Sequence, residues 1–268
     1  MPIERVTTLC FAASYAVAMI FELVHQYRPR PIMRLFSTIA GGAGLFAHSV
    51  FLLVQRPGLS TQFGSLLLLA WIVAVFYWFG SLHRSRSSWS LFALPLVLGL
   101  VLLAVVWTPM GTATTIPVVQ NWEQFWGILH GSLLLLAGVG ICVGFMASVM
   151  YLVQAQRLKV KTPPGKGIPL LSLERLEVMN RRALNLAFPL LTAGVLVGAI
   201  LMLQEGVLER GWLDAKVIGS LVLWGVFVLL LYLRYGAHLP GKRLAILTIV
   251  AFALLLITLV SPSTHFAP

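Results

Sequence analysis

The chain has 268 residues, of which 59% are hydrophobic and only 10% are charged, and its formal net charge is +11. Soluble domains carry about 25% charged residues, so this composition excludes an ordinary soluble domain and predicts an integral membrane protein. In membrane chains basic residues usually collect in cytoplasmic loops. The positive charge therefore does not by itself indicate a nucleic-acid partner.

Eight apolar runs are long enough to cross a bilayer as helices, which takes about 20 residues. They lie at residues 7–25, 33–55, 62–82, 88–107, 125–153, 184–205, 212–234 and 242–261. The fifth run is long enough to tilt or to protrude from the membrane. We therefore expect an all-α integral membrane protein, with one polytopic domain over residues 1–268 built as a bundle of about eight transmembrane helices.

Lysines and arginines alternate strictly between the loops that join these runs. Fifteen fall in loops on one side and three on the other, while Lys216 lies inside a run. The positive-inside rule then predicts that both termini, the loop 108–124 and the turn 206–211 are outside, and that the basic loop 154–183 is cytoplasmic. The charge is explained by topology, so we expect the cytoplasmic (inner) membrane as the location and no nucleic-acid partner.

The basic loop 154–183 is polar and Pro/Gly-rich at TPPGKG, and then becomes amphipathic. Its apolar positions Leu170, Leu173, Leu176 and Met179 are interleaved with charged residues. This pattern is typical of a helix that lies on the membrane surface and leads into the sixth span. Docking of a partner protein is the alternative.

The six histidines sort into two groups under this topology. His25, His83 and His238 lie at cytoplasmic ends beside basic residues, and we expect them to be interfacial. The other three fall on the outer side. His48 lies about two turns inside the second span, His130 about one turn into the fifth, and His265 just beyond the eighth. Three imidazoles can thus converge at one depth.

Aromatic residues and glycines accompany these outer histidines. Trp126 stands four residues before His130, so both lie on one helix face, and Gly44 stands four before His48, with Gly41 a further turn away. Glycine beside histidine leaves room for a flat group. An aromatic belt at the membrane boundary is the alternative for the tryptophans. Close helix packing is the alternative for the glycines, because three pairs have the small-xxx-small form: Gly127 and Gly131, Gly140 and Gly144, Gly194 and Gly198.

Two neutral imidazoles on opposite faces of a planar macrocycle are the ligand set of a b-type haem. Zinc is less well supported, because no histidines are paired at i, i+4 and the acidic residues nearby are only Asp214 and Glu123. Asp214 and Lys216 fit a solvated helix start or a proton relay, and Glu22 is expected to be interfacial.

Catalytic motifs are missing from the sequence. It has no Gly-rich phosphate loop, no nucleophile with a nearby base and no paired carboxylates. Cys10 and Cys142 belong to no Cys-x-x-Cys pattern that would attach haem covalently. We therefore expect a binding protein and not an enzyme, with transport of an unrelated small molecule as a remaining class.

The second half of the chain resembles a known family in the order and spacing of three segments. His130 opens a long span that ends in YLVQAQRLKVK, followed by LLSLERLEVMNRRALNLAFPLLTAGVLVGAI and by a span ending in LYLRYGAHLPGKRLAILTIVAFALLLITL. This succession is similar to the cytochrome c assembly membrane family, the CcsA, CcmC and HemX group. We identify residues 125–265 as the assembly-like region, while residues 1–110 share only the general plan, as in the HemX-like branch.

The resemblance implies a cytochrome c-type biogenesis protein that binds or handles haem b non-covalently at the outer face of the membrane. The family's two external histidines correspond to His130 and His265, as haem-iron ligands, with Trp126 and Trp212 facing the porphyrin. Two further cofactor-binding candidates are His48 and Asp214. A second membrane protein, resembling the ResB type, is implied as partner beside the lipid bilayer and haem itself.

The family's tryptophan-rich signature, of the form W-x-W-D-P-K-E, is degenerate in this chain. It reads Gly-Trp-Leu-Asp-Ala-Lys-Val over residues 211–217, which keeps Trp212, Asp214 and Lys216 but lacks one tryptophan, the proline and the glutamate. The full segment cradles the porphyrin in members that present haem. Its loss favours the HemX-like branch, and the alternative function is a regulatory or scaffold subunit of a membrane complex without haem transfer.

Overall fold

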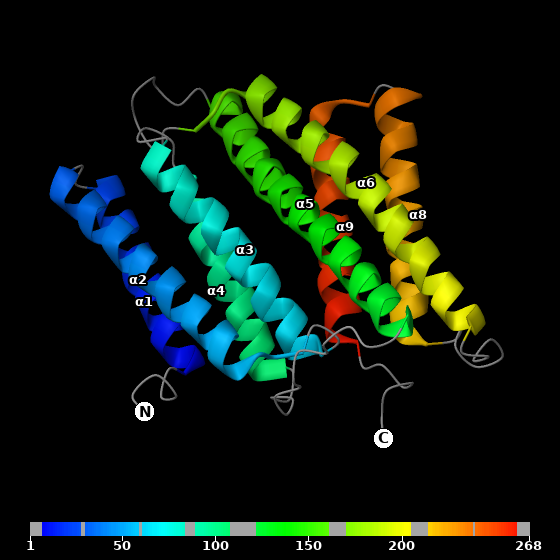
Figure 1. Cartoon of the computed structure of the whole chain (residues 1–268). Coiled ribbons are helices and arrows are strands. Elements are labelled where there is room, and N and C mark those ends of the chain that lie inside the picture. The colour runs from blue at the N-terminus through cyan, green and yellow to red at the C-terminus, as the bar shows by residue number, and fades with distance from the viewer. Residues whose placement is uncertain are drawn as a thin grey trace. The chain divides into compact units, whose positions relative to one another are not determined.

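A computed structural model describes residues 7–27, 30–58, 61–83, 89–107, 122–160, 170–204, 214–237 and 239–261 of the chain. Within these ranges every regular element is an α-helix and none is a strand. The helices form two compact units within the single polytopic chain: unit 1 comprises residues 1–116 and 161–171, and unit 2 comprises residues 117–160 and 172–268. Figure 1 shows the helices of each unit lying side by side.

All eight predicted spans are helices in the structure. Unit 1 holds α1 (Thr8–Tyr27), α2 (Pro31–Gln55), α3 (Gln62–His83) and α4 (Ser90–Trp107). Unit 2 holds α5 (Trp122–Lys159), α6 (Leu173–Gln204), α8 (Ala215–Tyr235) and α9 (Gly241–Val260). Seven of these are long and apolar enough to cross a membrane, and the apolar stretch Ser90–Val106 of α4 is slightly shorter. The expected all-α integral membrane protein is confirmed.

Unit 1 buries several aromatic residues and presents other large apolar residues outward. In it α1 packs on α2 and α4, and α3 packs on α4 and α2. Phe11, Tyr15 and Tyr77 are completely or almost completely buried, whereas Leu9 and Phe46 are more than two-thirds exposed. Exposing large apolar side chains to water costs free energy, whereas lipid solvates them well. The surface of unit 1 therefore suits a membrane environment.

Glu22 on α1 accepts hydrogen bonds from two other helices of unit 1. Its Oε1 accepts a hydrogen bond from the Ser90 hydroxyl on α4 at 2.6 Å, and its Oε2 accepts one from the Ser37 hydroxyl on α2 at 3.1 Å. Both serines are buried. The carboxyl group therefore joins three helices of unit 1, while the interfacial position of Glu22 stays a prediction.

Unit 2 is dominated by the antiparallel pair of α5 and α6 (Figure 1). With 38 and 32 residues, these helices are about 57 and 48 Å long at 1.5 Å per residue. Both exceed the roughly 30 Å hydrocarbon thickness of a bilayer. The length expected to make the fifth span tilt or protrude is confirmed, and α6 shares it.

The amphipathic stretch at the end of the basic loop forms the first turns of α6. Its amphipathic character is confirmed, since Leu176 is fully buried while Arg175 and Glu177 are exposed. The prediction of a separate helix on the membrane surface is wrong, because α6 is continuous from Leu173 to Gln204. The apolar face of these turns is buried within unit 2 and does not depend on lipid.

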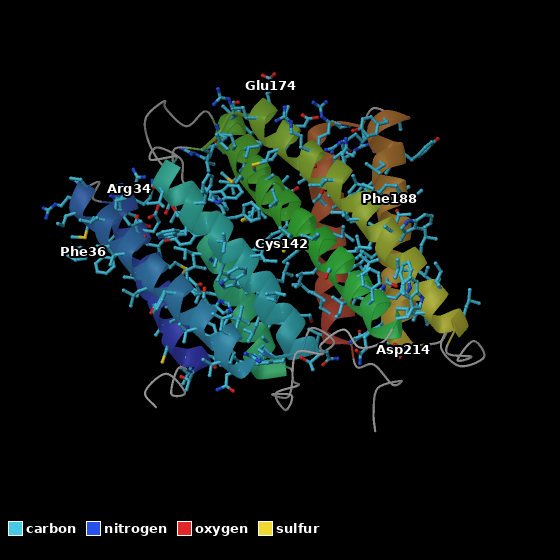
Figure 2. The ribbon with its side chains drawn as sticks, viewed as in Figure 1. Arg34, Phe36, Cys142, Glu174, Phe188 and Asp214 are labelled. Atoms are coloured by element: carbon cyan, nitrogen blue, oxygen red, sulfur yellow. The ribbon has the colours of Figure 1, made fainter. Side chains whose placement is uncertain are left out.

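Charge divides unit 2 into two ends. The basic end is formed where α5 and α8 finish and where α6 and α9 begin, and it carries Arg157, Lys159, Arg175, Arg181, Arg182, Arg234, Lys242 and Arg243. The opposite, low-charge end is formed by the first turns of α5 and α8 and the last turns of α6 and α9. Figure 2 shows Glu174 at the basic end, Asp214 at the low-charge end and Cys142 midway along α5. The low-charge end is the predicted outer end of the unit.

Candidate functional site

His130 lies on α5 at the low-charge end of unit 2, eight residues after Trp122 begins the helix. Its half-buried ring packs against α6, where Nδ1 is 2.7 Å from the carbonyl oxygen of Gly194. A carbonyl oxygen can only accept a hydrogen bond, so Nδ1 carries the proton and donates it. In the neutral ring the lone pair is then on Nε2. That is the nitrogen that a metal ligand needs.

Gly198, one turn after Gly194 on α6, provides the space for this ring. A Cβ atom at Gly198 would lie 2.6 Å from Cε1 and 2.9 Å from Nδ1 of His130, distances that real Cβ atoms essentially never show. At Gly194 a Cβ atom would instead approach Leu134. The pair Gly194 and Gly198 therefore serves two purposes: one residue permits close helix packing, as predicted, and the other accommodates the histidine.

The other two small-xxx-small pairs differ from each other. Cβ atoms at Gly140 and Gly144 would meet α6, at Ala187 and Leu184 respectively, which confirms that this pair permits close packing of α5 on α6. A Cβ atom at Gly127 or at Gly131 would have no described atom within 4 Å. For these two glycines, which flank His130 and Trp126, the described residues provide no packing partner, and the packing explanation stays a prediction.

Three aromatic side chains surround the start of α5. The Trp122 and Trp126 ring centroids are 5.4 Å apart with an edge-to-face angle of 80°, and Phe125 is 5.7 Å from Trp126. Trp122 is 67% exposed and Phe125 is 45% exposed. Trp126 lies one turn before His130, on the same face. Exposed aromatic rings here fit both a membrane-interface belt and a surface for a flat apolar ligand.

Asp214 begins α8 at the same end of unit 2. Its carboxylate accepts a hydrogen bond from the backbone N–H of Lys216 at 2.8 Å, the N-cap arrangement expected for an acidic residue at this position. The side chain is only 5% exposed. The helix start is therefore confirmed but is not solvated. Trp212 and His265, the other candidates at this end, lie outside the residues that the structure describes.

His48 belongs to unit 1, and its side chain is completely buried. The imidazole stacks on Phe11, with centroids 4.1 Å apart and planes parallel within 1°, and Nδ1 is 3.5 Å from the Tyr15 hydroxyl. Its Nε2 is buried and has no hydrogen-bond partner among the described residues. The space beside Gly44 and Gly41, expected to hold a flat group, is taken by Tyr15 and Tyr77.

The described residues contain no cluster of three or more His, Cys, Asp or Glu side chains that could hold a metal ion. A haem needs fewer protein ligands than a zinc site, because the porphyrin supplies four nitrogens and the protein only the axial positions. His130 fits one axial position by its tautomer, its location and the aromatic rings beside it. His48 belongs to unit 1 and His130 to unit 2.

These features define a multi-pass α-helical membrane protein with a half-buried, tautomer-fixed histidine at the low-charge end of its second unit. The sequence profile of the cytochrome C assembly protein family matches residues 59–264, and the chain belongs to this family. The match includes His130 and Asp214 and begins well upstream of the expected assembly-like region 125–265. His48 and His265 lie outside the matched range.

Curated relatives agree with this assignment. The chain is 25% identical over 246 aligned positions to the cytochrome c biogenesis protein CcsA of a Synechococcus species, covering 72% of this chain and 71% of that one. It is 22% identical over 302 positions to the protein of the same name from Gloeobacter violaceus, with 92% and 89% covered. The Mesostigma viride protein is 20% identical over 285 positions, with 95% and 92% covered.

Proposed function

We propose that this protein handles haem for cytochrome c biogenesis at the outer face of the inner membrane, with His130 and His265 as the axial ligands of a non-covalently bound haem b. The observation that carries the proposal is the hydrogen bond from Nδ1 of His130 to the Gly194 carbonyl. Ligating histidines in metalloproteins almost always donate their other ring nitrogen to such an acceptor. His265 follows from the family resemblance and from the charge-based topology.

The other residues at this end bind and orient in the proposed site. Trp126 lies beside His130 on α5 and offers an aromatic face to the porphyrin, and Trp212 takes the same part from the segment before α8. Asp214 caps the N-terminus of α8, two residues after Trp212 in the sequence. When bound, haem would supply an iron centre whose spin state depends on whether both axial imidazoles are in place.

The protein is proposed to bind and present haem and not to act as an enzyme by itself. The sequence shows no motif of a nucleophile with a nearby general base. A second membrane protein of the ResB type is proposed as partner. Support comes from the family membership and from the paired architecture that the resemblance implies.

A HemX-like regulatory or scaffold role is the second candidate function, and one observation favours it. At the basic end of unit 2, α5 and α6 extend beyond the length needed to cross the hydrocarbon layer, and Arg175, Arg181 and Arg182 of α6 are exposed there. An exposed basic helical surface suits the docking of a partner with an acidic surface. This role needs no haem.

The absorption spectrum of gently purified, full-length protein tests the proposal. Two axial imidazoles give a low-spin b-type spectrum, so haem handling predicts that spectrum in the wild-type protein. A pigment-free preparation, made under conditions that keep b-type haem in other membrane proteins, would contradict the proposal. Pigment-free protein that retains a stable partner would favour the scaffold role.

A further inference from the structure

We infer that Gly194 and Gly198 of α6 are positioning residues for His130. The Gly194 carbonyl fixes the tautomer of the ring, and the lack of a side chain at Gly198 leaves room for the ring in its present plane. Nε2 is therefore available as the ligand atom before haem binds. The inference rests on the proposed function and deepens it, because it assigns to α6 a positioning role at the site, whereas the small-xxx-small spacing of Gly194 and Gly198 by itself indicates only helix packing.

The tautomer argument concerns the proton on the imidazole. A free neutral histidine exchanges its proton between the two ring nitrogens, and only a nitrogen without a proton can bind iron. The 2.7 Å contact to a carbonyl oxygen is satisfied only when Nδ1 holds the proton. The opposite tautomer would place two lone pairs against each other in a half-buried setting, which is costly. The ring is therefore held in its ligating form.

The plane of the His130 ring depends on the space at Gly198. A methyl group at residue 198 would lie 2.6 Å from Cε1, 2.9 Å from Nδ1 and 3.5 Å from Nε2 of His130. The clash falls on the ring itself and not on main-chain atoms. The ring would therefore turn away from α6 and lose its bond to Gly194, because a side chain rotates more easily than two long packed helices separate.

Simple helix packing is the rival explanation for these glycines, and the chain offers a matched control. At Gly140, on the same helix pair, an added Cβ would lie 2.8 Å from Cβ of Ala187 and 3.1 Å from the Ala183 carbonyl oxygen. Gly140→Ala therefore disturbs the α5–α6 contact without touching His130. If packing alone matters, Gly140→Ala and Gly198→Ala have the same effects. If Gly198 positions the histidine, only Gly198→Ala changes the imidazole.

The first readout needs no haem. In full-length apoprotein labelled with ¹⁵N-histidine, at a pH of about 9 where free histidine is neutral, the His130 signal is assigned by its loss in His130→Gln. The wild type and Gly140→Ala should show the Nδ1–H tautomer with a bare Nε2. In Gly198→Ala this tautomer should give way to a mixture or to the Nε2–H form. A persistent Nδ1–H signal in Gly198→Ala would overturn the inference.

The second readout uses added haem. Gly198→Ala should bind haem at least about tenfold more weakly or lose the low-spin spectrum, and external imidazole should restore the low-spin form because it supplies the displaced nitrogen. Gly140→Ala should keep the wild-type spectrum. Equal haem spectra in the wild type and Gly198→Ala would overturn the inference. A wild type that shows the Nδ1–H tautomer but never takes up haem would refute the proposed function while supporting the positioning of the ring, so the two failures are distinguishable.

Discussion

Arg234 on α8 donates a hydrogen bond from Nη2 to Oδ1 of Asn180 on α6 across 2.8 Å, and both side chains are buried. The Asn180 amide nitrogen in turn lies 3.1 Å from the Gly144 carbonyl, 2.8 Å from the Ser148 hydroxyl and 3.2 Å from the Thr248 hydroxyl. One asparagine thus joins α5, α6, α8 and α9. It also orients a guanidinium group whose Nη1 has no hydrogen-bond partner among the described residues.

Asn180→Leu should therefore destabilise unit 2 strongly. It removes the acceptor of a buried cation, and a buried polar group left without its partner costs about 1–3 kcal/mol, more when it is charged. Arg234→Met should cost less, because it removes the charge together with its unmet donor. The double variant should lose less stability than the sum of the two single changes, as measured by denaturant unfolding in detergent micelles. Additive losses would show that the two side chains are not coupled.

Gly140→Ala should lower the free energy of unfolding by about 1–3 kcal/mol, the usual cost of overpacking a well-packed contact. The added methyl group would press on Ala187 and on the Ala183 carbonyl of α6. Gly225→Ala on α8 is the matched control, because a Cβ there meets no described atom within 4 Å. Alanine is the better helix former by about 1 kcal/mol, so the control should be neutral or slightly stabilising. Thermal unfolding of the two variants distinguishes these outcomes, and equal melting temperatures would refute the close contact.

The orientation in the membrane should place the basic end of unit 2 in the cytoplasm. Two exposed positions at opposite ends of the unit serve as reporters, Glu174 in α6 and Trp122 in α5. Glu174→Cys and Trp122→Cys are each made in a background without the native cysteines Cys10 and Cys142. A membrane-impermeant thiol reagent added to intact cells should label residue 122 and not residue 174. The reverse pattern would invert the topology and remove His130 from the outer face.

A second membrane protein should accompany this chain when it is purified from native membranes with a mild detergent. The expectation follows from the resemblance to CcsA-type proteins. Mass spectrometry of the purified complex identifies the partner, and a ResB-like protein is the expected one. A solitary, monodisperse chain that completes haem attachment by itself would contradict this.

The sequence predicted the helices well because apolar length alone decides which segments span a membrane. Their ends were predicted less accurately: α6 begins at Leu173, eleven residues before the expected 184, because the Arg- and Glu-rich turns have an apolar face that packs inside the protein. Hydropathy averages over all faces of a helix and therefore cannot detect this. The beginning of α5 at Trp122 likewise moves His130 from about one turn to about two turns inside the helix.

The candidate site was predicted only in part, for a different physical reason. Helical spacing correctly placed Trp126 beside His130, since that relationship is local. The contacts of His130 with Gly194 and Gly198 join residues more than sixty positions apart, and nothing in the local sequence indicates them. The hydrogen bond between Glu22 and Ser90 was not predicted for the same reason, because Ser90 lies 68 residues further along the chain.

The absorption spectrum of four histidine variants tests the central claim most directly. His130→Ala and His265→Ala each remove one proposed axial ligand, and should convert the low-spin b-type spectrum to a high-spin one or release the haem. His83→Ala and His238→Ala, at the predicted cytoplasmic ends, should keep the wild-type spectrum. External imidazole should restore the low-spin form in the first pair by filling the vacated position. An unchanged low-spin spectrum in both His130→Ala and His265→Ala would contradict the account and leave His130 as a packing residue at the membrane boundary.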